Sequence, residues 1–223
     1  MVQNPAAEGS PSARTLRKKR EILQAASRVF RCRGLHGAGM REIAAEAGMR
    51  AGNLYYYFES KQDLLAFCQQ DGLEGLLRLA DWVAGSGLAA DQKLYLLIAG
   101  HVHLVNEGTP GSLAHLEVEA LEPRRRDEIL PRRDLYENVI RDLVGAGVEA
   151  GIFRISDAKA AALAILGAVN WTVKWFRPDG PRTASAIGRE FAELLVRGLL
   201  APGVAFRAPE IEPFAAELET ASA

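Results

Sequence analysis

Three blocks of apolar residues at helical spacing, separated by glycines, constrain the fold of this chain more than any other feature. Residues three or four apart share one face of an α-helix, so such blocks predict amphipathic helices. Their apolar members are Ile22, Leu23, Ala26, Val29 and Phe30, then Met40, Ile43, Ala44 and Ala47, then Leu54 and Phe58. Glycines from Gly34 to Gly39 end the first block, and Gly48 ends the second. The first sixty residues therefore predict three helices, of which the last two are short.

The second and third predicted helices are joined by only three residues, Gly48-Met49-Arg50. A tight turn of this kind, held rigid by a preceding helix, lets the N-terminal residues of the last helix reach base edges in the DNA major groove. The charge distribution points the same way, because residues 1–61 hold 11 Lys and Arg against 5 Asp and Glu, whereas the remainder holds 16 against 23. A basic head on an acidic body predicts a polyanionic partner for the head.

The rest of the chain also has helical periodicity. Ser60-Lys61-Gln62-Asp63 has the form of a helix start, and a long helix is expected from there to about Ala84. Further helices are expected over Asp91–Asn106, Ser112–Leu121, Arg132–Ala150, Asp157–Phe176 and Thr183–Leu200. No strand pattern and no internal repeat is visible in the sequence.

We therefore expect an all-α fold, with a three-helix N-terminal helix-turn-helix DNA-binding domain and a larger helical-bundle domain, to which a family resemblance, given below, assigns ligand binding and dimerisation. The expected divisions are a mobile tail at residues 1–13, the DNA-binding domain at 14–61, the helical domain at 62–201 and a C-terminal tail at 202–223. Within that last tail, at most Phe206 or Phe214 is expected to dock on the body.

Several function classes find no support in the sequence. The longest apolar stretch, Asp157–Phe176, contains two lysines and an asparagine, so no membrane span is expected, and the first residues lack the apolar core of a secretory signal. A cytoplasmic protein is expected, with Cys32 and Cys68 as buried thiols. His101 and His103 diverge on a helix, which predicts core or pocket polarity and no metal site. No catalytic constellation and no cofactor motif is recognisable, so we expect no enzyme.

Residues 40–48, MREIAAEAG, and residues 52–61, GNLYYYFESK, resemble the signature of the TetR/AcrR repressors. The resemblance covers roughly residues 16–65. It implies a homodimer that binds double-stranded, pseudo-palindromic operator DNA, with recognition helices about one DNA turn apart, roughly 34–36 Å. It also implies a helical body that senses a small molecule.

The resemblance and the residue chemistry together predict the DNA contacts, at Arg50, Ala51, Gly52, Asn53, Tyr55, Tyr56 and Lys61. Gly52 allows close approach to the DNA backbone, and Asn53 is suited to adenine or phosphate. The tyrosine rings suit thymine methyls and their hydroxyls suit phosphates, whereas the ammonium of Lys61 neutralises a phosphate. Arg50 is the candidate for a guanine contact, and Ala51 occupies a position that varies in the family.

Other residues near the reading helix have competing interpretations. Tyr57 and Phe58 are expected in the core, and Glu42 and Glu46 are expected as surface charges. The basic run at residues 17–20 either reaches DNA phosphates or is only a solvated helix start. Ala38-Gly39 stands where the family usually has Thr or Ser, so a capping hydroxyl is missing, although glycine also serves as an N-cap.

The body suggests a dimer interface and an effector site. The last two predicted helices carry apolar stripes, with Gly167, Gly188 and Ala192 as small residues for close helix approach; the alternative is an ordinary intramolecular core. An aromatic cluster supplies the predicted ligand-binding residues, Trp171, Lys174 and Trp175.

The aromatic cluster resembles a segment of TetR repressors that respond to acyl-CoA thioesters. Basic residues at 123–126 and 132–133 either hold CoA phosphates or lie in a solvated loop. The effector is therefore expected to be an acyl-CoA thioester or another hydrophobic compound. The protein is expected to act as a repressor, with a transcriptional activator or architectural DNA binder as the alternative. A helical enzyme or carrier with a degenerate helix-turn-helix is the remaining alternative to a regulator.

Overall fold

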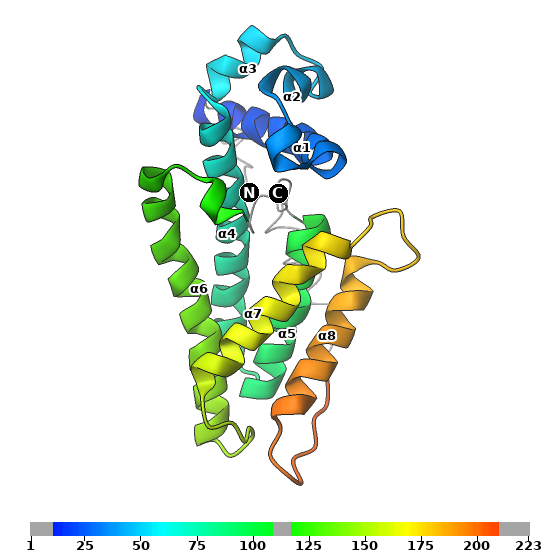
Figure 1. The fold of residues 1–223 in the computed structure, drawn as a ribbon. Helices are drawn as coiled ribbons and strands as arrows, with labels where there is room; N and C mark the ends of the chain where they lie inside the picture. Colours follow the sequence, from blue (N-terminus) through cyan, green and yellow to red (C-terminus); the bar gives the residue numbers. More distant parts are fainter. Residues whose placement is uncertain (1–10, 109–116, 210–223) are drawn as a thin grey trace, which may run out of the picture.

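The computed structural model describes residues 11–108 and 117–209, which form a helical protein (Figure 1). The α-helices are α1 (Pro11–Gly37), α2 (Met40–Glu46), α3 (Ala51–Tyr57), α4 (Lys61–Gly85), α5 (Ala90–His103), α6 (Pro123–Glu149), α7 (Ala158–Trp175) and α8 (Ala184–Leu199). A π-helical turn, Leu104–Gly108, extends α5, and a short 3-10 helix covers Val118–Ala120. Among the described residues no strand forms; Phe153 and Leu200 make one isolated bridge. The expected all-α fold is confirmed.

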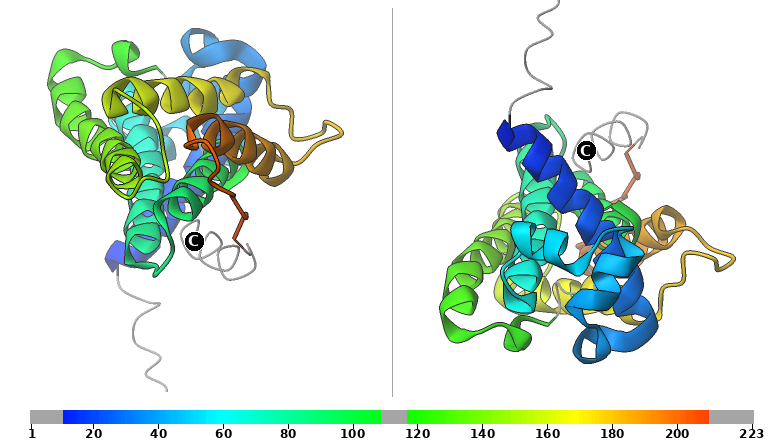
Figure 2. Two further views of the ribbon diagram at one scale, coloured as in Figure 1. Left: turned by 90° about the horizontal axis from the view of Figure 1, so that it is seen from below. Right: turned by 90° about the horizontal axis from the view of Figure 1, so that it is seen from above.

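Helices α1 to α3, here called the reader, lie across one end of the bundle formed by α4 to α8, here called the body (Figures 1 and 2). Helix α4 belongs to both units. Its first turns supply Leu64, Leu65 and Cys68 to the reader core, and its later turns supply Leu73 and Leu76 to the body core. One continuous helix therefore joins the reader to the far end of the body.

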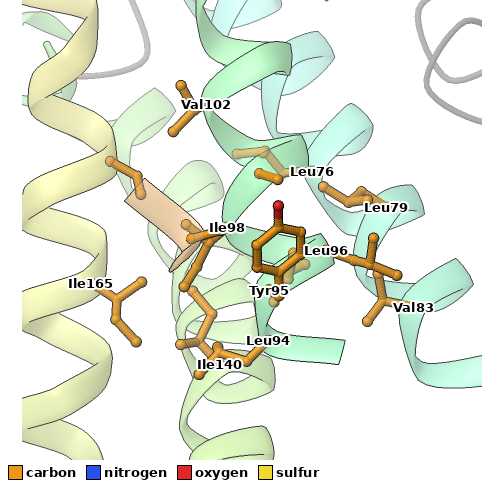
Figure 3. Packing of buried hydrophobic residues seen from close by; sticks show 14 of the residues in the cluster. Leu76, Leu79, Val83, Leu94, Tyr95, Leu96, Ile98, Val102, Ile140 and Ile165 are labelled. Carbon is orange, nitrogen blue, oxygen red and sulfur yellow. The ribbon is translucent and has the colours of Figure 1, made fainter. Parts of the chain in front are cut away.

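Helix α5 is the buried centre of the body and packs against α4, α6, α7 and α8. Its side chains interdigitate with those of the neighbouring helices, as Figure 3 shows for Leu94, Ile98 and Val102. The closest approach is between α5 and α8, where a Cβ built on Gly188 would lie 2.6 Å from the carbonyl oxygen of Ala99. Gly188 therefore serves packing inside the protomer.

Several predicted boundaries shift. Helix α1 begins at Pro11, inside the predicted tail 1–13, and continues past Gly34, whose φ of 70° breaks its regularity. Helix α6 begins at Pro123 and not near Arg132, because Pro123 suits the first turn and Pro131 is accommodated inside the helix. Half of the helix predicted over residues 112–121 lies outside the described residues, and the other half contains only the short 3-10 helix Val118–Ala120.

The predicted C-terminal tail is partly docked. Phe206 is buried, with its ring centroid 5.7 Å from that of Tyr95 on α5, as one of the two docking interpretations expected. The other, Phe214, lies outside the described residues. No helix in the described ranges has the length and apolarity to cross a membrane.

Candidate DNA-binding surface and effector pocket

The reader presents α3 on a rigid support. Ile43 of α2, with Leu54 and Phe58 of the α3 segment, is fully buried in the reader core, which holds the two short helices together. Gly48, with a φ of 66°, makes the turn between them, a conformation that glycine adopts without strain. The predicted core position of Phe58 is confirmed, whereas Tyr57 is half-buried and packs edge-on against the ring of Tyr56, with centroids 5.1 Å apart.

Helix α2 starts without a capping hydroxyl, and a carboxylate compensates for it. The Glu42 side chain accepts a hydrogen bond from the backbone N–H of Gly39 at 3.1 Å, which is half of a capping box. The same carboxylate pairs with Arg33 of α1, and Glu46 pairs with Arg28 of α1. The two predicted surface charges are therefore partly exposed ion-pair partners that fix α2 on α1.

One side of α3 and its N-cap is open to solvent. Arg50, Gly52, Asn53, Tyr55 and Tyr56, here called the reading surface, are all exposed, and Tyr56 is 81% exposed. The sixth predicted contact on this helix, Ala51, is half-buried and packs on the reader core. The structure thus brings five of the predicted DNA contacts onto one surface and turns one toward the interior.

Gly52 has no intramolecular reason to be glycine. Its φ is not positive, and a Cβ built on it meets nothing within 4 Å. Glycine within a helix costs about 0.8–1 kcal/mol relative to alanine. Gly52 therefore lowers helix stability without being required for packing inside the chain. This combination points to close approach of a partner molecule to the backbone at Gly52.

Lys61 has a structural role that sequence reasoning missed. Its Nζ donates to the carbonyl oxygens of Leu35 and His36 at the end of α1, at 2.5 and 3.4 Å. Partial burial lowers the pKa of this ammonium group. A cation at the C-terminal end of a helix stabilises its free carbonyls and opposes its dipole. The phosphate contact predicted for Lys61 stays a prediction beside this capping role.

The four basic residues at 17–20, predicted either to reach DNA phosphates or to form a solvated helix start, have different surroundings in the structure. Arg17 and Lys18 line a surface depression beside Tyr56 and Tyr57, next to the reading surface. Lys19 instead lies over the rings of Phe58 and Phe67, and Arg20 pairs with Asp71 of α4 at 3.3 Å. Arg17 and Lys18 therefore lie beside the reading surface, whereas Lys19 and Arg20 hold α1 against neighbouring elements of the reader and α4.

A cavity of about 120 Å³ lies between α4, α5, α6 and α7. It is lined by Leu73, His101, Leu130, Arg133, Asp134, Tyr136, Glu137, Leu166 and Asn170. Its polar side is a buried network in which Nε2–H of His101 donates to Oδ1 of Asn170 at 3.0 Å, while Nδ1 accepts from the Tyr136 hydroxyl at 3.0 Å. Burial lowers the pKa of His101 to about 4, so the ring is neutral near pH 7. The pocket polarity predicted for His101 is confirmed.

The second histidine lies elsewhere, as the helical spacing predicted. Nδ1 of His103 lies 3.1 Å from the Ser185 hydroxyl and 3.7 Å from the Glu107 carboxylate. Across residues 11–108 and 117–209, no three His, Cys, Asp or Glu side chains are grouped to hold a metal ion. The cysteines differ from each other: Cys68 is buried, which raises the pKa of its thiol, but Cys32 is exposed, so its predicted burial was wrong.

The three residues predicted to bind the effector do not line this cavity. Trp171 and Trp175 are 62% and 45% exposed, because they share an outward stripe of α7, whereas the cavity faces the stripe of Leu166 and Asn170. Lys174 and Trp175 border a broad, open surface depression that also includes Cys32 of the reader. Trp171, Lys174 and Trp175 therefore do not belong to this cavity, and ligand binding at these residues stays a prediction.

The basic residues at 123–126 belong to the first turns of α6, not to a loop. Arg125 pairs with Asp63 of α4 at 3.2 Å, and Arg126 pairs with Glu119 at 2.8 Å. Arg124 is exposed and pairs only weakly with Glu128, at 3.9 Å. Further along α6, burial lowers the pKa of Arg133 at the cavity wall. These arginines therefore point to ion pairs with neighbouring segments, to solvent and to the cavity wall, and they form no single basic patch.

A three-helix reader with an exposed recognition helix, mounted on a helical body, defines a helix-turn-helix DNA-binding protein. Residues 22–67 match the family model described as bacterial regulatory proteins, tetR family, and residues 87–199 match the model described as tetracyclin repressor-like, C-terminal domain. The chain belongs to the TetR family of transcriptional regulators.

Individual relatives resemble the chain over most of its length. The HTH-type transcriptional repressor KstR2 of Mycobacterium tuberculosis is 25% identical over 190 residues, which is 84% of this chain and 95% of the relative. The TetR-family regulator PfmR from Thermus thermophilus has a TM-score of 0.73 at 29% identity, covering 81% of this chain and 99% of that one. AibR in complex with isovaleryl coenzyme A and operator DNA has a TM-score of 0.70 at 26% identity, covering 82% and 98%.

Proposed function

We propose that this regulator is a dimeric repressor that binds a pseudo-palindromic operator and is released from it by a small hydrophobic effector, in particular an acyl-CoA thioester. The observation that carries the DNA-binding part is Gly52, an exposed glycine in a recognition helix with no packing need to be glycine. Arg50, Asn53, Tyr55 and Tyr56 surround it with groups suited to base edges and phosphates.

The proposed dimer uses the outer faces of α7 and α8, which lie side by side along one face of the body (Figures 1 and 2). Leu163, Gly167, Trp171 and Trp175 follow one another at four-residue spacing on α7, and Leu194, 71% exposed, stands on α8. Exposed large apolar side chains on two adjacent helices favour burial against a second copy. Of the small residues expected there, Gly188 and Ala192 are buried inside the protomer, so Gly167 is the one left for the interface.

The proposed effector site is the cavity beside His101, whose lining combines three leucines with the His101 hydrogen-bond network and three charged side chains of α6. A volume near 120 Å³ suits a short acyl group, because a cavity of about 150 Å³ holds benzene. The structural relative AibR, solved with isovaleryl coenzyme A, supports this chemistry. Lys174 lies one turn beyond Asn170 on α7, where its ammonium suits the anionic end of the same ligand.

The test begins with DNA that the protein selects from a random duplex library. Its affinity for that duplex is measured by fluorescence anisotropy with no addition, with isovaleryl-CoA and with longer acyl-CoAs. We expect palindromic selected sites, nanomolar affinity and a loss of affinity with an acyl-CoA. Transcription in vitro from a promoter that carries the site shows whether the protein lowers or raises the transcript yield, and we expect it to lower the yield. No selected site would overturn the DNA-binding part, and selected sites indifferent to every acyl-CoA would overturn the sensing part alone.

A further inference from the structure

Residues 117–122, here called the strap, connect the reader to both sides of the effector cavity. Gln62, in the first turn of α4, holds the strap with both ends of its amide. Its Nε2 donates to the carbonyl oxygen of Ala120 at 2.8 Å, and its Oε1 accepts from the backbone N–H of Glu122 at 3.0 Å. Leu121 of the strap is buried in the reader core. The strap is thus fixed to the part of α4 that supports the reader.

The acidic side chains of the strap face the opposite way, toward the helices of the effector cavity. The Glu117 carboxylate pairs with Lys174 of α7 at 2.7 Å, and the Glu119 carboxylate pairs with Arg126 of α6 at 2.8 Å. Both pairs are partly exposed to solvent, which screens ion pairs and makes them individually weak. A ligand with stronger anionic groups is therefore able to replace either carboxylate.

A second attachment of the strap to α4 is incompletely satisfied. Nε2 of Gln69 donates to the carbonyl oxygen of Glu117 at 3.3 Å, but Oε1 of the same buried amide has no hydrogen-bond partner among the described residues. An unpaired buried acceptor keeps its full desolvation penalty. The second attachment of the strap to α4 therefore rests on a single, long hydrogen bond from Gln69.

We propose that the strap is an anion-sensitive latch, which rests on the effector proposed above. The phosphate groups of a CoA-type effector take Lys174 and Arg126 from Glu117 and Glu119, because a phosphate monoester carries more negative charge than a carboxylate and offers three acceptor oxygens to these cations. The freed strap loosens its hold on Gln62 and Gln69, and α4 no longer fixes the reader in the geometry that spans two half-sites. The three leucine side chains of the cavity supply affinity for the acyl group, and displacement of the strap carboxylates by the anionic end of the ligand changes the position of the reader.

The first experiment needs no ligand. Neutralising both carboxylates, Glu117→Gln with Glu119→Gln, removes the two ion pairs while keeping side-chain size. We expect about a tenfold loss of affinity for the selected duplex, within the range of ordinary allosteric coupling. The matched control is Glu128→Gln, which removes a carboxylate from α6 that pairs with the exposed Arg124. It is expected to leave affinity unchanged, and thermal unfolding checks that both proteins are folded.

The second experiment adds free coenzyme A, which has the anionic groups without the acyl chain. Free coenzyme A is expected to weaken DNA binding by the wild type and to have no further effect on the double glutamine variant. Equal DNA affinity of variant and wild type would overturn the latch, and so would equal responses of the two proteins to isovaleryl-CoA. In that second case the proposed effector response survives while the strap mechanism fails. If no acyl-CoA acts on the wild type, the sensing proposal fails, and the ligand-free comparison still decides whether the strap positions the reader.

Discussion

Tyr56 and Phe58 stand two residues apart and illustrate how the reader separates contact from support. Tyr56 is almost fully exposed, whereas Phe58 is fully buried. Replacement Tyr56→Ala should lower the affinity for the selected duplex about tenfold or more, as expected for one lost contact, without changing the unfolding temperature. Phe58→Ala should instead destabilise the fold by about 3–5 kcal/mol through a core cavity. Anisotropy titration and thermal unfolding of both variants measure the contrast, and undiminished DNA affinity of Tyr56→Ala would contradict the proposed surface.

His101 makes the free energy of unfolding decrease as the pH falls. The pKa of the ring is about 4 in the folded protein against 6.5 in the unfolded chain, because burial disfavours the charged form. Above pH 6.5 both states hold the ring neutral, so it makes no contribution to pH dependence. Between pH 6.5 and 4 the unfolded chain takes up a proton that the folded protein excludes, which lowers the free energy of unfolding by roughly 3 kcal/mol in total.

The variant His101→Gln isolates this effect, since glutamine does not titrate. Urea unfolding at steps from about pH 7 to pH 4 should show that the wild type loses roughly 3 kcal/mol more stability than the variant over that window. The control His36→Gln removes an exposed histidine and should keep the wild-type slope. Parallel pH profiles for the wild type and His101→Gln would show that the ring is not held neutral.

At the scale of elements, the packing of α8 on α5 depends on one glycine. Gly188→Ala would place a methyl group 2.6 Å from the Ala99 carbonyl oxygen, so the helices must separate, and we expect destabilisation by about 1–3 kcal/mol. Gly198→Ala, later in the same helix, meets nothing within 4 Å and should stabilise the protein by roughly 0.5–1 kcal/mol through helix propensity. Chemical denaturation of the two variants measures both signs. A neutral Gly188→Ala would mean that α5 and α8 are packed more loosely.

The elements that sequence predicted well are those whose signal is local. Periodicity and glycine breaks are enough for α2, α3 and α4, and the Ser60 cap is found as expected, accepting from the backbone N–H of Asp63 at 3.1 Å. The start of α6 was missed because Pro131 reads as a helix breaker, although the helix tolerates it. The strap was missed because its hydrogen bonds join residues 48–60 positions apart, which no local pattern reveals.

The same distinction applies to the site. The exposed side of α3 follows from the burial of Leu54 and Phe58, so five of its predicted contacts fall together. The faces of α7 could not be assigned, because that helix is apolar on almost every side and only the packed structure shows which stripe the body buries. Trp171 was therefore placed in a pocket when it lies on the outside. His101 was recognised as polar within an apolar helix, but its partners Tyr136 and Asn170 lie on two other helices.

For the whole molecule, the separation of charge and the apolar outer face point to one assembly. In the proposed dimer, two basic readers are held at a fixed spacing to engage two half-sites, and the acidic body is repelled by DNA, so we propose that the copies meet through the body. The outer stripes of α7 and α8 meet this requirement. Trp171 and Trp175 on α7 and Leu194 on α8 are exposed, and the ring centroids of Trp175 and of Phe191 on α8 lie 6.1 Å apart.

Charge placed in this face should therefore separate the copies without unfolding them. Trp171→Glu and Leu194→Glu put a carboxylate where an apolar contact is proposed, and burying an unpaired charge is costly. Sedimentation at micromolar protein should show monomers, and affinity for the full palindrome should fall about a hundredfold or more, because the second half-site no longer adds its binding. The control Leu135→Glu changes another exposed leucine on α6, away from this face, and should stay dimeric with full DNA affinity. A protein that stays dimeric with both the α7 and the α8 substitution would show that the interface lies elsewhere. The spacing of the two readers on which the strap is proposed to act would then be set by another surface.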